Sequence, residues 1–246
     1  MPSLVAFLAG YALGAVPVAW LLVRWRHGFA LHAAGSTNIG ATNAYETTGS
    51  KKTGLAVLVL DLLKGALAVL TGWTVHYLLG AAPSFAEATR LFWPGAAALL
   101  GALLGHNYNL FLSLKAGKLA GGKGFATAAG GFLFLIPLAV LTWLVLLWVG
   151  IRAFERWKGV RDLIPGNLFA TTLAIPFAWA VYGPDAAGAV AAFAALTVPK
   201  HIRQMGALLR TPYGVDPFEA TPARAVGGAR RSEPGPQESV NADESR

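Results

Sequence analysis

A short segment rich in glycine and lysine, GKLAGGKG at positions 117–124, is well suited to bind a phosphate group. Glycines let backbone N–H groups approach an anion closely, and the ammonium group of Lys123 adds a compact positive charge. We expect a helix to begin at Phe125, so that the positive end of its dipole points at the same place. The sequence therefore predicts a phosphate site formed by Gly121, Gly122, Lys123 and Gly124.

The same segment nearly matches the P-loop that binds nucleotides, but it departs from that pattern at a decisive position. A P-loop has Ser or Thr directly after its lysine to bind magnesium, and this chain has Gly124 there. A P-loop also needs a strand before it within a soluble α/β domain, which this apolar chain does not suggest. The segment therefore indicates an anion site and not a nucleotide site.

A second segment of small and hydrogen-bonding residues, GSTNIGATN at positions 35–43, joins two apolar runs. Such residues are ordinary in turns and helix caps, so a capped connector explains them. The segment also suits an oxyanion cradle, in which Ser36, Asn38 and Asn43 add side-chain donors to the backbone N–H groups. Both interpretations stay open on the sequence alone.

Ionisable residues inside the apolar runs are candidates for a supporting role. Asp61 and Lys64 are three positions apart, which puts them on one face of a helix. Charged groups within a membrane are costly, so they are usually functional or paired with one another. A structural ion pair and a role beside the site are both consistent with this spacing. His106, in the sequence GHN at 105–107, is a further supporting candidate.

His201 and Gln204 lie near the end of the last apolar run, in the sequence KHIRQ at 200–204. Their spacing puts them on one helical face at the expected membrane boundary. A base or an orienting group for a substrate bound by the loops would have to lie there. A lone histidine is more often structural than catalytic, so both roles are considered for His201.

The composition is that of a membrane protein. Of the 246 residues, 55% are hydrophobic and 13% are charged, and the mean hydropathy is +0.52. The basic residues, which give a net charge of +8, occur in short loops between apolar runs. The positive-inside rule explains this pattern better than nucleic-acid binding does. The absence of cysteine excludes disulfides and thiolate metal sites.

Six apolar runs stand out, at roughly 4–23, 55–79, 91–112, 125–151, 163–182 and 186–199. If the fourth run were one helix, the basic loop that follows it would lie outside, against the positive-inside rule. A break at Pro137 removes this conflict, although the 27 residues of the run would then form two short helices. We therefore expect an all-α polytopic membrane protein with about seven transmembrane helices, an external N terminus and a cytoplasmic C terminus.

The two ends of the chain differ in character. The first run lacks a basic segment before it and a small-residue cleavage site after it, so we expect it to be retained as a membrane helix. After Arg210 the sequence is rich in Pro, Gly, Ser, Glu and Arg and has no apolar periodicity. Residues 1–210 are therefore expected to form the membrane domain, and 211–246 a disordered cytoplasmic tail.

The motif segments together resemble the bacterial acyl-phosphate:glycerol-3-phosphate acyltransferases, which are integral membrane enzymes. The resemblance covers about 10–210 and is carried by GSTNIGATN (35–43), LDLLKG (60–65), GH (105–106), GGKGFAT (121–127) and HIRQ (201–204). It implies seven membrane helices, an external N terminus and cytoplasmic motif loops in the bacterial inner membrane. This topology agrees with the one inferred from the loop charges.

The resemblance also implies a reaction. A fatty acyl group passes from acyl phosphate to the 1-hydroxyl of glycerol 3-phosphate, giving lysophosphatidic acid and phosphate, with no metal, nucleotide or covalent enzyme intermediate. Lys123 would neutralise phosphate charge, and His201, with Gln204 beside it, would take or relay the hydroxyl proton. A substrate phosphate oxygen is an alternative base. Asp61, Lys64 and His106 would support the site.

Several polar positions depart from the family pattern. Thr37 replaces a usual glycine, Glu46 replaces a basic residue, and Gln204 replaces an asparagine. Ile164 and Asn167 lie where the family has a serine-containing stretch, and 116–120 lengthens the glycine segment. These changes raise a first rival function, a related enzyme with another acceptor or no activity. Asp61, Lys64 and the glycine-broken helices raise a second, a membrane transporter or lipid-binding protein.

Overall fold

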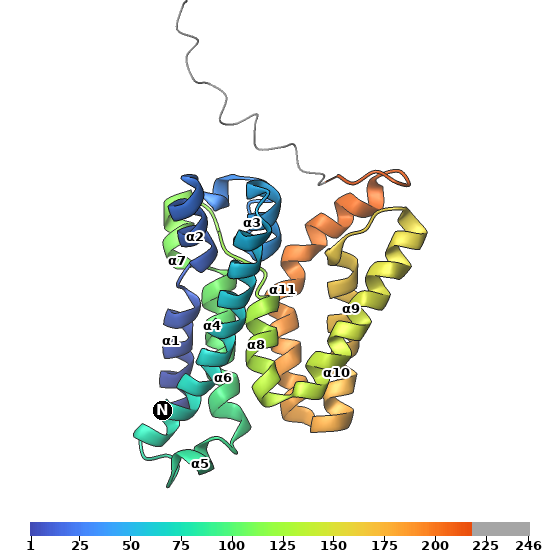
Figure 1. The fold of residues 1–246 in the computed structure, drawn as a ribbon. Helices are drawn as coiled ribbons and strands as arrows, with labels where there is room; N and C mark the ends of the chain where they lie inside the picture. Colours follow the sequence, from blue (N-terminus) through green and yellow to red (C-terminus); the bar gives the residue numbers. More distant parts are fainter. Residues whose placement is uncertain (218–246) are drawn as a thin grey trace, which may run out of the picture.

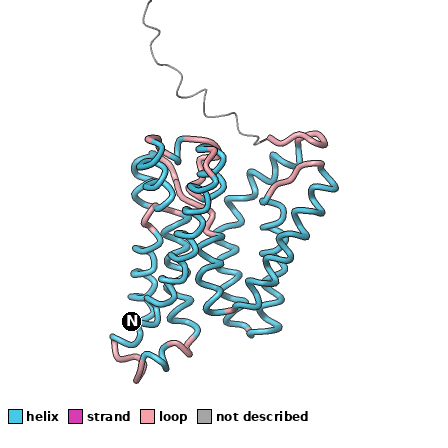
Figure 2. Tube along the Cα trace, in the orientation of Figure 1, coloured by secondary structure: helices cyan, strands magenta, loops and turns pink. Residues whose placement is uncertain are grey.

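The computed structural model describes residues 1–217, and that part of the chain is helical and contains no β-strand (Figures 1 and 2). The helices are α1 (Pro2–Gly14), α2 (Val18–His27), α3 (Ala41–Thr48), α4 (Lys51–Leu78), α5 (Phe85–Ala88), α6 (Phe92–Asn107), α7 (Leu110–Ala116), α8 (Phe125–Leu135), α9 (Pro137–Lys158), α10 (Leu163–Tyr182) and α11 (Pro184–Arg210), with a 3₁₀ turn at Leu31–Ala33. The all-α prediction is thus confirmed for these residues. Most of the expected tail, 218–246, lies outside the described residues.

Within residues 1–217, five helical segments are long and apolar enough to cross a membrane. They are Pro2–His27, Lys51–Leu78, Phe92–Ala116, Pro137–Lys158 and Leu163–Tyr182. Many of their leucine, valine and tryptophan side chains face outward, as expected for helices whose solvent is lipid. The chain is therefore a multi-pass membrane protein.

The expected break at Pro137 is confirmed, but the lengths on either side differ from the expectation. Proline lacks an N–H group and is favourable at the first turn of a helix, and α9 begins at this residue after α8 has ended at Leu135. The helix α9 continues past the apolar run to Lys158, so its 22 residues extend about 33 Å at ~1.5 Å per residue. Of these two helices, α8, with 11 residues, is too short to span a bilayer by itself.

Two other apolar runs are each divided into two helices, which the hydropathy pattern did not predict. Pro17 separates α1 from α2, and Tyr108 and Asn109 separate α6 from α7. The last run is longer than expected, because α11 extends to Arg210.

The helices form two groups, with α8 between them (Figure 1). In one group α1, α4 and α6 pack closely through small residues; a Cβ atom on Gly101 would lie 2.0 Å from the carbonyl oxygen of Phe7. The other group contains α9, α10 and α11. Helix α8 packs on α4 at Gly65, where a Cβ atom would lie 1.8 Å from the carbonyl oxygen of Thr127. The close contact at Gly65 therefore fixes the position of α8 against α4.

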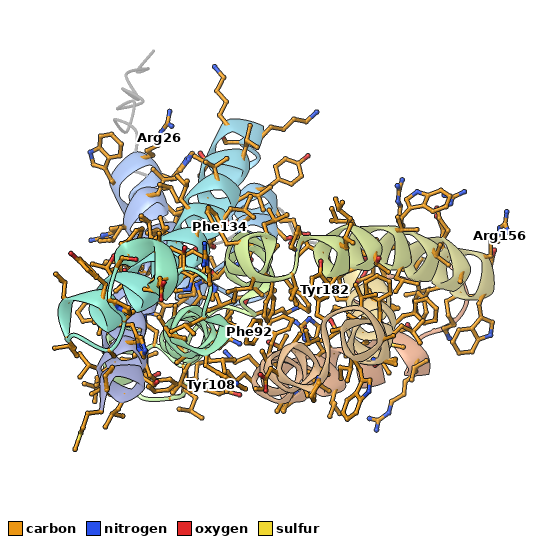
Figure 3. All side chains as sticks on the ribbon, turned by 90° about the horizontal axis from the view of Figure 1, so that it is seen from below. Arg26, Phe92, Tyr108, Phe134, Arg156 and Tyr182 are labelled. Carbon is orange, nitrogen blue, oxygen red and sulfur yellow. The ribbon has the colours of Figure 1, made fainter. Side chains whose placement is uncertain are left out.

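The candidate residues gather toward one end of the molecule. The N terminus and α5 lie at one end, and α2, α3, α7 and the last turns of α11 lie at the other (Figure 1). The segment 117–124, which we call the glycine loop, runs inward from that second end to the start of α8. Viewed from the N-terminal end, Phe92 lies among the central helices, whereas Arg26 and Arg156 lie at the rim (Figure 3).

Candidate active site

The glycine loop has a defined backbone conformation, because its carbonyl groups are held by neighbouring segments. The carbonyl of Ala120 accepts a hydrogen bond from the Asn109 N–H at 2.9 Å. Two later carbonyls are held from α11: Gly122 O accepts from Lys200 Nζ at 2.8 Å, and Lys123 O accepts from Thr197 Oγ1 at 3.1 Å. Gly124 has φ = +77°, a left-handed conformation that favours glycine.

The two N–H groups of the loop that directly precede α8 are left available. Gly122 N–H donates to His106 O at 2.9 Å, but within the described residues the N–H groups of Lys123 and Gly124 have no protein acceptor. Helix α8 begins at Phe125, as predicted, with no side-chain cap at Gly124. The loop therefore offers two unpaired backbone donors at the positive end of a helix, an arrangement that favours an anion.

Lys123 adds its charge to this site in surroundings of mixed sign. Burial lowers the pKa of Lys123, and the negative charges of Asp162 and Glu46 act in the opposite direction. Partial desolvation, followed by repulsion from Asp162 and Asp216, raises the pKa of Glu46, although this residue lies on the exposed side of α3. Asp162 caps α10 by accepting a hydrogen bond from Ile164 N–H at 2.6 Å. Two carboxylates thus lie close enough to Lys123 to influence its charge.

His201 is fully buried on α11 and has one ring nitrogen without a partner. Its Nδ1 atom lies 3.0 Å from Thr197 O. A carbonyl can only accept, so Nδ1 carries the proton and Nε2 carries the lone pair. The Nε2 atom has no partner in the described residues, and neither does the buried Oε1 atom of Gln204. His201 thus has the tautomer that a general base requires, and its ring contacts Phe125 at the start of α8 (centroids 5.2 Å apart).

The segment 35–43 contacts the glycine loop, but its polar residues have different roles. Asn43 is buried, and its amide is used by backbone groups: Oδ1 accepts from Ser36 N–H at 3.0 Å, and Nδ2 donates to Asn38 O at 2.8 Å and Ala34 O at 3.1 Å. The side chains of Ser36 and Asn38 make no hydrogen bond within the described residues. Asn43 thus shapes the segment, and Ser36 and Asn38 keep their donors available.

Asp61, Lys64 and His106 form a buried cluster that supports the glycine loop. Lys64 Nζ lies 3.2 Å from Asp61 Oδ1 and donates to Val16 O at 2.9 Å, so the expected ion pair is confirmed. His106 Nδ1 lies 3.6 Å from Asp61 Oδ1. The opposite edge of the imidazole faces Gly122, where a Cβ atom would lie 1.9 Å from Nε2. The cluster therefore holds His106 against the loop, and only glycine fits at position 122.

An apolar cavity begins beside the site and extends between α8, α9, α10 and α11. Phe125 lies at the site end of this cavity and Ile136 at the far end of α8. Its other lining residues are Ala128, Ala129, Phe132, Ala139, Val140, Trp143, Thr171, Ala174, Val190 and Phe193. Thr171 is the one polar residue in this lining.

Comparison with known proteins decides the family. The family model described as glycerol-3-phosphate acyltransferase matches residues 4–211. The chain belongs to the glycerol-3-phosphate acyltransferase family. The glycerol-3-phosphate acyltransferase 2 of Moorella thermoacetica is 35% identical over 161 residues, which are 65% of this chain and 72% of that protein. The glycerol-3-phosphate acyltransferase of Trichlorobacter lovleyi is 34% identical over 204 residues, 82% of this chain and 92% of that protein.

A solved structure shares the fold. The glycerol 3-phosphate form of PlsY (YgiH), an integral membrane glycerol 3-phosphate acyltransferase, superposes with a TM-score of 0.67 at 27% identity. The match covers 85% of this chain and 92% of that chain. The resemblance inferred from the motif segments is thereby confirmed, and the chain is an acyltransferase of this family.

Within this glycerol-3-phosphate acyltransferase, sequence reasoning missed the residues that hold the glycine loop. From the sequence alone, no role is assigned to Lys200, Asn107 or Thr197. Asn107 Nδ2 donates to Thr197 Oγ1 at 3.2 Å, which links the end of α6 to α11. The position of Lys200 directly before His201 was the one available signal.

The departures from the family pattern lie in different surroundings. Thr37 has φ = +60°, the left-handed conformation for which glycine is suited. Ile164 and Asn167 are buried in the first turns of α10. Glu46, in contrast, lies within electrostatic reach of Lys123. Of these changes, Glu46 therefore bears most directly on the charge of the site.

Proposed function

We propose that this enzyme transfers a fatty acyl group from acyl phosphate to the 1-hydroxyl of glycerol 3-phosphate, giving lysophosphatidic acid and inorganic phosphate. The observation that carries the proposal is the position of three features around Phe125. The unpaired N–H groups of Lys123 and Gly124 precede it, His201 contacts its ring, and the apolar cavity starts at its side chain. An anion site, a base and a hydrocarbon site are thus contiguous.

The proposed reaction is a direct acyl transfer. The hydroxyl oxygen attacks the acyl carbon, the carbon–oxygen bond to the phosphate breaks, and phosphate leaves. Lys123 and the two N–H groups stabilise the phosphate charge as the acyl carbon becomes tetrahedral. His201 Nε2 accepts the hydroxyl proton directly or relays it, with Gln204 one turn away, and the leaving phosphate is the final proton acceptor. Phosphate is a good leaving group, so this sequence of steps needs neither a nucleotide nor a metal.

The donor's acyl chain is proposed to lie in the apolar cavity. Helix α8 lines it from Phe125 to the junction with α9, a length of roughly 16 Å at ~1.5 Å per residue. Phe132 and Phe193 narrow it, with ring centroids 6.2 Å apart. Each methylene gains about 0.8 kcal/mol only on transfer from water, so for a donor already in the bilayer the cavity mainly orients the acyl chain.

The proposed topology has seven membrane passes in the bacterial inner membrane. To the five long spans we add α8, shielded between the two helix groups, and α11, whose basic residues lie at its C-terminal end. The basic motif end faces the cytoplasm by the positive-inside rule, which leaves the N terminus outside. A reporter inserted after Gly183 should then be external, and one fused after Arg210 should be cytoplasmic; the opposite result would overturn this topology.

The proposed roles of the polar residues follow their contacts. Ser36 and Asn38, with free side-chain donors, bind phosphate together with the glycine loop. Asn43 and the cluster of Asp61, Lys64 and His106 shape the two segments and do not contact substrate. The buried pairing of Asp61 with Lys64 accounts for these charges without a transport pathway.

Glu46 favours a second candidate function, acyl transfer to an acceptor other than glycerol 3-phosphate. A carboxylate beside Lys123 repels an acceptor phosphate, where the family's basic residue would attract it. Purified protein supplied with acyl phosphate and either glycerol 3-phosphate or neutral polyols distinguishes the two candidates. Release of lysophosphatidic acid supports the first, product formation only with a neutral acceptor supports the second, and no turnover with either overturns both.

A further inference from the structure

Lys200 is held against the backbone of the site. Its Nζ atom donates to the carbonyl oxygens of Gly122, at 2.8 Å, and Asn107, and it lies 4.6 Å from the ring centroid of Tyr108. Thr197, three residues earlier on α11, donates from Oγ1 to the carbonyl of Lys123 at 3.1 Å. Two side chains of one helix therefore hold two consecutive carbonyls of the glycine loop.

Because the peptide unit is planar and trans, holding these carbonyls also fixes the direction of the N–H groups that follow them. In each peptide unit the C=O and the following N–H point in opposite directions. Holding Gly122 O toward Lys200 therefore turns the N–H of Lys123 away from α11, and holding Lys123 O toward Thr197 does the same for the N–H of Gly124. Among the N–H groups of the loop that have no acceptor within the described residues, these two lie directly before helix α8.

We propose that Lys200 and Thr197 are positioning residues that orient the N–H groups of Lys123 and Gly124 toward the substrate phosphate. The inference rests on the proposed function, since it takes the loop to be the phosphate site. It also ties the loop to the base, because the backbone carbonyl of Thr197 fixes the Nδ1 atom of His201. One turn of α11 thus sets both the anion site and the proton acceptor.

The test removes each contact with little change of shape. Lys200→Met keeps the aliphatic stem and removes the ammonium, and Thr197→Val replaces the hydroxyl with a methyl group. Each should weaken competitive inhibition by inorganic phosphate about tenfold, as expected for the loss of one hydrogen bond to a loop that binds an anion. Thr197→Ser keeps the hydroxyl and should retain inhibition close to that of the wild type.

A second measurement separates positioning from direct contact with phosphate. Without substrate, hydrogen–deuterium exchange of a peptide covering 119–127 should become faster in Lys200→Met, because the loop loses its contact with α11. The matched control is Lys158→Met, since Lys158 also donates to two carbonyls, Leu209 O at 3.2 Å and Thr211 O at 2.8 Å, outside the glycine loop. The control should change neither phosphate inhibition nor exchange of the loop.

The outcomes are distinct. Weaker phosphate inhibition with faster loop exchange supports the inference. Weaker inhibition with unchanged exchange means that Lys200 contacts phosphate directly, and unchanged inhibition in both Lys200→Met and Thr197→Val means that neither residue positions the loop; each result overturns the inference. If Lys200→Met fails to fold, phosphate inhibition and loop exchange are compared between Thr197→Val and Thr197→Ser, and this comparison decides the inference. A wild-type protein that transfers no acyl group would overturn the proposed function, and with it this inference.

Discussion

The Nδ1 atom of His201 lies 3.0 Å from the carbonyl oxygen of Thr197, and this contact places the ring proton on Nδ1. The lone pair on Nε2 is therefore available in a buried position that has no partner within the described residues. The two ring nitrogens thus correspond to two possible roles. An orienting residue needs only the Nδ1–H donor, whereas a general base needs the lone pair on Nε2.

Substitution of His201 distinguishes these roles. His201→Asn keeps a donor for Thr197 O but lacks a basic nitrogen, so kcat should fall about 10²-fold or more, the usual contribution of a general base. The measurement is steady-state acyl transfer by membrane-inserted protein with a wild-type thermal unfolding profile. A variant with nearly normal kcat would assign the base to the substrate phosphate.

The buried pair of Asp61 and Lys64 should couple strongly in stability. Removing one partner leaves the other charge uncompensated, so Lys64→Met alone should lower the free energy of unfolding by about 3–5 kcal/mol. The double variant Asp61→Asn, Lys64→Met removes both charges and should be clearly more stable than the single variant. Thermal unfolding in detergent measures both; equal or additive losses would show that the two charges act independently.

Thr37 is a site where substitution should stabilise the protein. A β-branched residue with φ = +60° is strained by about 1–2 kcal/mol, and glycine relieves this at some cost in chain entropy. Thr37→Gly should therefore gain about 0.5–1 kcal/mol in the free energy of unfolding, seen as a higher Tm. Thr37→Ala keeps a Cβ atom and should gain less; a lower Tm in the glycine variant would contradict the strain.

The pH dependence should reflect the lowered pKa of Lys123. Phosphate binding needs the ammonium form, so kcat/KM should fall as pH rises through this pKa, at a lower pH than for an ordinary lysine. The free energy of unfolding should instead rise with pH between the pKa of Lys123 in the folded protein and that in the unfolded chain. In this range the folded protein has lost the proton and no longer bears the cost of a buried charge, whereas the unfolded chain still holds it.

Glu46 provides the control for this pH profile. Its negative charge favours the ammonium form of Lys123, so Glu46→Gln should move the alkaline limb of kcat/KM to lower pH. The same variant removes repulsion and should lower the KM for glycerol 3-phosphate. An alkaline limb that stays in place or moves to higher pH would show that Glu46 does not act on Lys123.

Part of this architecture could be predicted from the sequence because local rules decide it. Proline chemistry placed the break at Pro137, and the extent of α10 agrees with the apolar run at 163–182. The same rule applied to Pro17 would have divided the first run, which hydropathy alone did not. Helix α9 extends beyond its apolar run because residues 152–158, in which charged side chains alternate with Ala153, Phe154 and Trp157, continue the helix.

The finer geometry of the site depends on contacts between residues far apart in the chain. The glycine loop and its lysine were predicted from residue type, but Lys200 and Gly122 are separated by 78 positions and nothing local pairs them. Asn43 is a case in which the residue was singled out correctly but its hydrogen-bond partners could not be predicted. The oxyanion-cradle interpretation took its amide to be a free donor, and only the folded segment shows that backbone carbonyls occupy it.

The most direct test of the anion-site account is the turnover of Lys123→Ala. Lys123 makes no hydrogen bond through its side chain within the described residues, so the variant should fold and insert normally. Loss of a charge contact in the transition state should lower kcat by about 10²–10³-fold, or about 3–4 kcal/mol. Lys123→Arg should recover only part of this, because a planar guanidinium does not replace a compact ammonium in a tight glycine loop. Nearly normal turnover in Lys123→Ala, in a preparation where the wild type is active, would contradict the account.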